Sequence, residues 1–438
     1  MAEREGFEPP RPCGPSVFKT DAFNHSAISP VTKVVVLYHI FLARVYPSMK
    51  YDIICAMKKI LLLACLAVAS AASAETVVNI SGVGAEKFTV SIQVANSDYS
   101  KCLAKNLEIS GLFVVKPNGS IKISGSSGSI SASGRGKVLT SPDVFSDAAS
   151  ARMAARRFSN ALCEAFGKQK GFALDKILFL NRGKSSGKGN VRPSEMCLSY
   201  PDGYDVKQIT SDSKMSIYQR WLNDDSVIYI SDVRGVPQVW EIDTNTGKRR
   251  MRWSLKGSPN GIAVSPDGTK IAAILSFQGN PELYVISGDR FVRLTKTPLA
   301  SEGQPTWSPD GKKIAYVSNE ARRPQIYVVD IATKQKRRLT SKGRENIDPD
   351  WGPDGRIAYI TKRGGAQVAV MSPAEGDASA QLVTEEGTWE HPSWARDMRH
   401  VTANSAGAIF IVDTEKDGDK PRRVFSAKGN FISPVWRR

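Results

Sequence analysis

Residues suited to metal binding or covalent catalysis are scarce in this chain. It has only four histidines and six cysteines among 438 residues, and the cysteines form no C-x-x-C pair or metal-ligand spacing. Hydrophobic residues make up 41% of the chain and charged residues 24%, which is ordinary for a globular protein. The composition therefore argues against a structural metal site and against a disordered chain.

Long hydrophobic runs are also missing. The apolar run from Ile60 to Ala69 has ten residues, whereas a membrane-spanning helix needs about 20. This run follows the basic start Met57-Lys58-Lys59 and precedes the small residues Ala72-Ser73-Ala74, which are the three parts of a secretory signal peptide. We therefore predict a signal peptide over residues 57–74, a mature chain from Glu75 and a periplasmic location.

The 56 residues ahead of this signal show no sustained helical or strand period. Their opening resembles spurious peptides that arise when a start codon is assigned too far upstream, so we expect Met57 to be the true start. The alternative is a genuine extension with a short, interrupted apolar stretch near Val34–Val45. Export leaves an odd number of cysteines, which cannot all pair. Cys102 and Cys163 either form a disulfide or remain buried free thiols, beside Cys197.

The formal net charge of +17 favours an anionic partner, such as an acidic protein face, a cell-wall polymer or lipid headgroups. The basic residues are scattered and form no single run. Together with export, this pattern argues against nucleic acid as a partner.

A repeat with a period of 42–44 residues fills the second half of the chain. Its clearest unit is Trp307-Ser308-Pro309-Asp310-Gly311, followed by short runs rich in β-branched and aromatic residues, such as Ile314–Ser318 and Gln325–Asp330. Pro, Asp and Gly together favour a tight turn. Calcium binding by these aspartates is the alternative, but each lies in a different repeat. The first positions of the six units, called marker residues below, are Trp221, Val264, Trp307, Trp351, Trp394 and Trp436.

Four strands in each repeat predict the blades of a β-propeller. The last marker, Trp436, has only two residues after it, so its blade receives one strand from the C-terminus. The three missing strands match residues 175–180, 195–200 and 206–210. We therefore predict a mainly β fold, with a six-bladed propeller over residues 171–438 that is closed by strands from both chain ends.

Residues 75–170 show a different pattern, which predicts a small α/β domain. Two segments have helical spacing of apolar residues, and each ends at a glycine. The expected helices are Asp98–Ser110 and Ser146–Phe166; the expected strands are Thr76–Ile80, Phe88–Ala95 and Leu112–Val115, with a loose hairpin over Gly119–Val138.

The exported start, the α/β domain, and the W-S-P-D-G repeats with I-A-Y-V-S and Q-I-Y-V-V-D resemble the TolB family of the Tol-Pal system over roughly Met57 to Arg438. Three features depart from the family pattern. The α/β domain is shortened within Pro117–Ser141, Val264 replaces an aromatic residue, and Asp397-Met398 replaces Asp-Gly.

The resemblance implies a monomeric, non-enzymatic adaptor, peripheral to membranes, without catalytic residues, metal or cofactor. It implies two partners, the peptidoglycan-associated lipoprotein (Pal) and TolA, with other envelope proteins as further candidates. It also implies a role in outer-membrane integrity, cell division and protein import.

Carried over by position, the contacts fall on two segments. The TolA contact is made by an N-terminal segment that adds as a strand to the edge of the partner's sheet. The alternative is that this segment is a plain edge strand of the α/β domain. Its residues are Glu75, Val77, Val78, Asn79 and Ile80. The Pal contact is made by the loops at one mouth of the propeller. The alternative is that these loops are ordinary solvated loops without a partner. The residues are Ser258, Pro259, Asn260, Glu302, Gln304, Asn346, Asp348, Glu390 and His391.

Two other functions compete with this reading. A propeller-associated peptidase is suggested by G-x-S-x-G at Gly183–Gly187, but no helix follows this motif, and only His391 and His400 lie beyond residue 75. A propeller that binds sugar or cell-wall polymer is compatible with the basic charge and the tryptophans. The recurring tryptophans are, however, expected at packing positions of the innermost strands.

Overall fold

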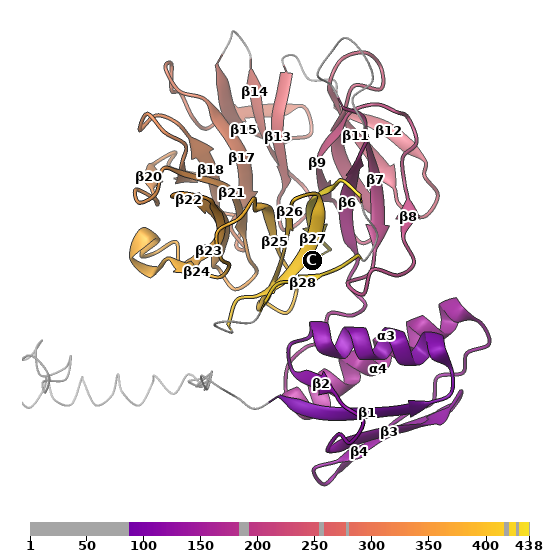
Figure 1. The fold of residues 1–438 in the computed structure, drawn as a ribbon. Coiled ribbons are helices and arrows are strands. Elements are labelled where there is room, and N and C mark those ends of the chain that lie inside the picture. The colour runs from indigo at the N-terminus through magenta and orange to yellow at the C-terminus, as the bar shows by residue number, and fades with distance from the viewer. Residues whose placement is uncertain are drawn as a thin grey trace, which may run out of the picture. The chain divides into compact units, whose positions relative to one another are not determined.

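The computed structural model describes residues 87–183, 192–253, 258–276, 280–415, 420–425 and 429–437. They form six four-stranded antiparallel sheets and one five-stranded mixed sheet (Figure 1). The predicted fold class is confirmed, because the chain is mainly β with six propeller blades. No helix in the described part is long and apolar enough to cross a membrane.

The five-stranded sheet and two helices make a small α/β layer. The strand order is β2-β1-β3-β4-β5, with β1 parallel to both of its neighbours. Helix α4 starts at a capping box in which Asp147 accepts a hydrogen bond from the Ser150 amide at 2.8 Å. The elements are β1 (Phe88–Val94), α3 (Ser97–Ile109), β2 (Phe113–Val115), β3 (Ile121–Ser126), β4 (Ser129–Gly134), β5 (Lys137–Ser141) and α4 (Ala148–Gly167).

The segment expected to be a loose hairpin is a three-stranded meander, β3-β4-β5. Ile121, Ile123, Ile130 and Ala132 are buried, and the residues that alternate with them along β3 and β4 are mostly serines. Period-2 burial of one face thus outweighs the low strand propensity of serine and glycine here. Residues 75–80, with the predicted strand Thr76–Ile80, lie outside the described residues.

Each blade runs from an innermost strand at the channel to an outermost strand at the rim. The first two complete blades are formed by β9 (Ser216–Trp221), β10 (Ser226–Ser231), β11 (Gln238–Asp243) and β12 (Arg249–Trp253), and by β13 (Ser258–Val264), β14 (Ile271–Ser276), β15 (Pro281–Ser287) and β16 (Arg290–Arg293). The next two are formed by β17 (Glu302–Trp307), β18 (Lys313–Ser318), β19 (Gln325–Asp330) and β20 (Lys336–Arg338), and by β21 (Glu345–Trp351), β22 (Ile357–Lys362), β23 (Ala366–Met371) and β24 (Gln381–Leu382). The fifth is formed by β25 (Glu390–Trp394), β26 (His400–Ser405), β27 (Ala408–Asp413) and β28 (Arg422–Arg423). A short 3-10 helix, η1 (Gly376–Ser379), precedes β24.

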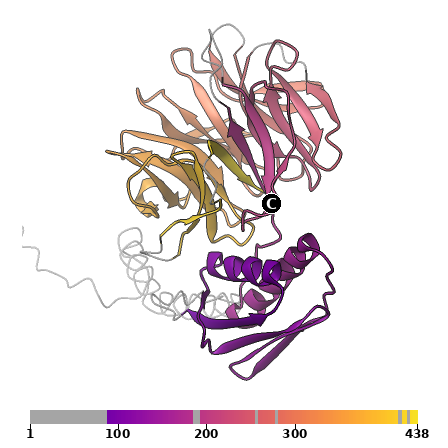
Figure 2. The same ribbon diagram turned by 45° about the vertical axis from the view of Figure 1, so that its right-hand side comes forward.

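The sixth blade, called the shared blade below, uses both ends of the propeller sequence. Its strands are β29 (Phe431–Trp436), β6 (Ile177–Arg182), β7 (Ser194–Ser199) and β8 (Lys207–Gln208). The C-terminal strand β29 pairs antiparallel with β6, with Trp436 opposite Ile177. Figure 2 shows the C-terminus, marked C, at this blade. The predicted closure of the ring is therefore confirmed.

The marker residues pack between blades. Trp394 and Trp436 are fully buried, and Trp307 and Trp351 are 5% exposed. The Trp307 indole donates to the Ala263 carbonyl of the preceding blade at 3.1 Å. These four tryptophans therefore belong to the core between the blades.

A buried ion pair joins α4 to the shared blade. The Arg156 guanidinium donates to both carboxylate oxygens of Asp202, at 2.7 and 3.0 Å, and both side chains are 0% exposed. The Asn106 amide of α3 donates to the same carboxylate at 2.9 Å, and the Cys102 thiol does so at 3.2 Å. Two helices of the α/β layer are thus fixed to one turn of the propeller.

The three described cysteines are all free and buried. Cys102 and Cys163 therefore do not pair. Burial raises the pKa of the Cys163 thiol to about 12 and that of Cys197 to about 11, so both thiols stay protonated.

Candidate functional site: the propeller channel

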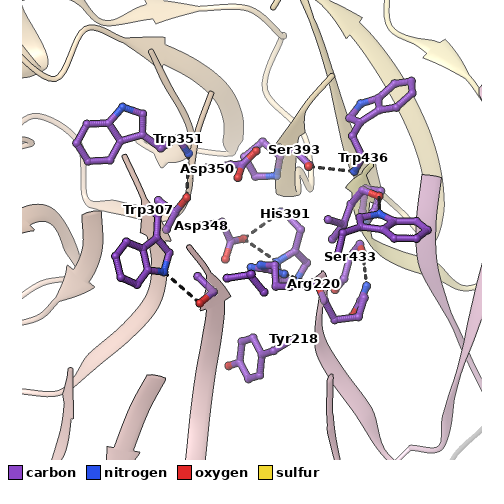
Figure 3. Close-up of a pocket in the computed structure, with 18 of the residues that line it drawn as sticks. Tyr218, Arg220, Trp307, Asp348, Asp350, Trp351, His391, Ser393, Ser433 and Trp436 are labelled. Carbon is purple, nitrogen blue, oxygen red and sulfur yellow. Dashed lines mark hydrogen bonds and ion pairs between the residues drawn. The ribbon is translucent and has the colours of Figure 1, made fainter. Parts of the chain in front are cut away.

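A channel of about 700 Å³ runs between the innermost strands of the six blades (Figure 3). This volume is within the range of about 300–1,000 Å³ that is usual for ligand pockets. The end of the channel at which the innermost strands begin is called the start-side mouth below. The other, the turn-side mouth, is formed by the turns that follow the marker residues, including Pro266, Pro309 and Pro353.

Every innermost strand carries a β-bulge before its marker. The residue three positions before the marker has φ between 50° and 54° in five blades, although none of the five is glycine. This left-handed conformation is uncommon for residues with a side chain, and costs about 1–3 kcal/mol. The six residues, called the bulge ring, are Tyr218, Gly261, Gln304, Asp348, His391 and Ser433.

The bulges turn side chains toward the channel axis, as a bulge can re-aim the residue that it displaces. The members Tyr218, Asp348, His391 and Ser433 are seen along the channel wall in Figure 3. In four blades the residue that follows the bulge ring is proline. The strain thus recurs in five blades at one level of the channel, which we call the waist.

A hydrogen-bonded network crosses three blades at the waist. The Gln304 side-chain amide donates to Asp348 Oδ1, and Gln304 Oε1 accepts from the Asp348 amide at 2.9 Å. The His391 amide donates to Asp348 Oδ2 at 3.0 Å, and His391 Nδ1 lies 3.4 Å from the same oxygen. The Asp348 side chain is only 6% exposed, whereas the His391 ring is 38% exposed to the channel.

The pair Asp348–His391 shifts the pKa values of both groups. Burial acts to lower the pKa of His391, but the nearby carboxylate outweighs burial, so this pKa lies above its ordinary value of 6.5. Burial likewise acts to raise the pKa of Asp348, and His391 holds it below the ordinary value. Both shifts favour the charged form of the pair.

We expect the pKa of His391 to fall below 6.5 when Asp348 is replaced by asparagine, because burial then acts on the imidazole without the compensating charge. An NMR titration of the imidazole signals in the unmodified protein and in Asp348→Asn measures both values. Equal pKa values in the two proteins would show that the carboxylate does not control this histidine.

Residues directly before the markers link neighbouring blades on one half of the ring. Backbone amides of three markers donate to side chains of the preceding blade: Trp351 to Thr306 (3.0 Å), Trp394 to Asp350 (2.8 Å) and Trp436 to Ser393 (3.2 Å). We call these contacts the blade latches. The corresponding positions on the other half are Arg220, Ala263 and Val435, whose side chains have no acceptor.

The structure places the predicted mouth residues in two groups. Gln304, Asp348 and His391 line the channel, while Pro259 and Asn260 lie on β13 and Glu390 is exposed at the start of β25. The side chain of Ser258 and residues Glu75, Val77, Val78, Asn79 and Ile80 are outside the described part of the chain.

Glu302 and Asn346 are buried and brace the mouth from behind. Glu302 accepts from the Thr297 hydroxyl at 2.6 Å, and burial raises the pKa of this carboxyl to about 7. The Asn346 amide donates to Gln325 Oε1 at 2.8 Å and to the Lys342 carbonyl at 2.7 Å. These two side chains hold loops in place and do not face the channel.

The channel wall also contains residues that sequence reasoning missed, among them Tyr218, Arg220 and Ser433. Their signal was present, because they stand one or three positions before the markers Trp221 and Trp436. The predicted contact covers the loops of only four of the six blades. Among the described residues no group of three or more His, Cys, Asp and Glu side chains is placed to hold a metal ion.

Six blades around a channel, with one blade completed by the C-terminus, define this chain as a closed β-propeller protein. The family model described as "TolB beta propeller domain" matches residues 163–438, and the chain belongs to that family.

Relatives and a solved structure agree with this assignment. The Tol-Pal system protein TolB of Francisella tularensis subsp. tularensis is 26% identical over 301 residues, which is 65% of this chain and 68% of the relative. The protein of the same name from subsp. mediasiatica matches equally. The crystal structure of TolB from Acinetobacter baumannii is similar in fold, with a TM-score of 0.69 and 20% identity, covering 81% of this chain and 97% of the other.

Proposed function

We propose that this chain is a non-enzymatic periplasmic adaptor of the Tol-Pal system, which binds Pal at the start-side mouth and TolA through its N-terminal segment. The observation that carries the proposal is the bulge ring. Five residues bear backbone strain at one level of the channel, and strain of this kind accumulates where a protein holds side chains for recognition. Membership of the TolB propeller family supports the same reading.

A catalytic role has little physical support in the described channel. His391 Nδ1 faces Asp348, and no described hydroxyl is hydrogen-bonded to this imidazole, so the base has no nucleophile beside it. The G-x-S-x-G motif at Gly183–Gly187 lies largely outside the described residues. An adaptor that supports outer-membrane integrity and cell division by joining two partners is consistent with a channel of this kind.

Binding of Pal is tested with the chain from Glu75 and the soluble domain of Pal from the same bacterium, by calorimetry. We expect Glu390→Arg, at the start-side mouth, to weaken binding at least about tenfold, because an exposed charge is reversed within the interface. The matched control is Glu375→Arg beside η1, far from the mouth, and it should bind as the unmodified chain does.

The TolA contact is tested in the same way with a chain that lacks residues 75–80. This shorter chain should lose TolA while it keeps Pal. If the full mature chain binds neither partner, the adaptor function is wrong.

A further inference from the structure

The acidic groups at the waist are already satisfied by protein donors. Asp348 accepts hydrogen bonds from the Gln304 side chain and the His391 amide, and its carboxylate lies 3.4 Å from His391 Nδ1. Asp350 accepts a hydrogen bond from the Trp394 amide at 2.8 Å. Because Asp348 is also nearly buried, it offers little to an incoming cation. This level of the channel is therefore poorly suited to binding a cation.

His391 is held so that its second ring nitrogen points away from Asp348. The backbone at φ 50° and the following proline fix the residue, while Nδ1 faces the carboxylate. The two nitrogens of an imidazole lie on opposite sides of the ring, so Nε2 is on the side turned from the carboxylate. The exposed part of the ring is then available to donate a hydrogen bond into the channel.

Arg220 supplies a cation from the opposite wall. Its strand β9 is separated from β21 by two strands in either direction around the ring of β9, β13, β17, β21, β25 and β29. One of its amino groups donates to the Gln219 carbonyl at 2.8 Å, and the side chain lines the channel. Its charge acts on both Asp348 and His391, and Figure 3 shows the three side chains together at the waist.

Resting on the proposed function, we propose that the partner segment that enters the start-side mouth carries a carboxylate, which Arg220 and His391 receive at the waist. A planar guanidinium and a charged imidazole both form short, strong hydrogen bonds with a carboxylate. The channel of about 700 Å³ is lined from the waist to the turn-side mouth, so a carboxylate side chain that reaches the waist has room beside Arg220 and His391.

This arrangement couples binding to protonation of His391. The charged groups around the imidazole are Asp348 on β21, Glu390 on its own strand and Arg220 on β9. A bound carboxylate adds a second negative charge beside the ring and favours its protonated form. Binding should therefore tighten as the pH falls from about 8 to about 6, through the range in which histidine gains its proton.

The test measures the affinity of the soluble Pal domain for the mature chain at about pH 6 and about pH 8 by calorimetry. Arg220→Gln should weaken binding about tenfold or more, and His391→Gln should abolish the pH dependence. Arg290→Gln on the outer strand β16 removes the same charge far from the channel and should change neither quantity. Thermal unfolding of each variant checks that it is folded, and Arg220→Lys, which keeps the charge, should lose less affinity than Arg220→Gln.

The carboxylate itself is found by changing each Asp and Glu of the Pal domain to its amide. One such change should weaken binding of the Pal domain to the unmodified chain about tenfold. The same change should not weaken binding to the Arg220→Gln variant any further, as expected for two groups that contact each other. If Pal binds, but neither Arg220→Gln nor a change of pH alters its affinity, this inference is overturned while the adaptor function stands. If Pal does not bind folded protein at either pH, the proposed function itself fails.

Discussion

Replacing Trp436 by alanine should lower the free energy of unfolding by about 3–5 kcal/mol, the usual cost of removing a large buried aromatic side chain. Trp436 is 1% exposed, its ring lies 5.5 Å from that of Phe172, and its amide donates to Ser393 at 3.2 Å. It also ends the strand that closes the ring against Ile177. Loss of this packing therefore weakens the one blade that holds both chain ends together.

Urea unfolding followed by circular dichroism measures the effect. The matched control is Trp253→Ala at the end of the outer strand β12, where the side chain is partly exposed and the loss should be about 1 kcal/mol. Similar losses for the two variants would contradict the role given to the closing strand.

Replacing Asp202 by alanine should cost about 3–5 kcal/mol, because it removes the only fully buried carboxylate beside the Arg156 cation and leaves the partly exposed Asp205, at 2.8 Å, as its remaining ion-pair partner. Both side chains are fully buried, and Asp202 also accepts from Asn106 and Cys102 of α3. One substitution therefore removes four hydrogen bonds that join the α/β layer to the shared blade.

The comparison for this variant is Asp212→Ala, which breaks a partly exposed pair with Arg249 on the rim of the propeller. Exposed pairs contribute about 0–1 kcal/mol. Replacing both members of the buried pair, Arg156→Met with Asp202→Leu, should be much milder than Asp202→Ala alone. Equal destabilisation by Asp202→Ala and Asp212→Ala in urea would show that burial of the first pair has no energetic weight.

The propeller could be predicted from the sequence because its signals are local and repeated. The marker residues recur every 42–44 positions, and the short tail after Trp436 leaves a blade that only the strands after residue 175 can complete. The meander β3-β4-β5 was harder, since serine and glycine conceal the alternating isoleucines. The helices were found to within two residues at each end because their apolar spacing and caps are strong.

The channel was predicted less well, because its features join residues that are distant in sequence. The contact of Gln304 with Asp348, and of Asp348 with His391, spans 43–44 positions each and depends on how neighbouring blades are placed. Left-handed residues at bulges are often glycine, but the five left-handed residues of the bulge ring all carry side chains, so glycine does not mark them in the sequence. Only its place one position before the marker Trp221 distinguishes Arg220 from an ordinary surface arginine.

The order in which the shared blade is assembled has a consequence for biosynthesis. Its strand β6 is made early, but its innermost strand β29 follows the strands of all the other blades in the sequence. Any product that stops before residue 431 leaves the inner side of β6 unpaired, and an unpaired strand edge invites aggregation. The ring is therefore closed only in a chain that has been translated through β29.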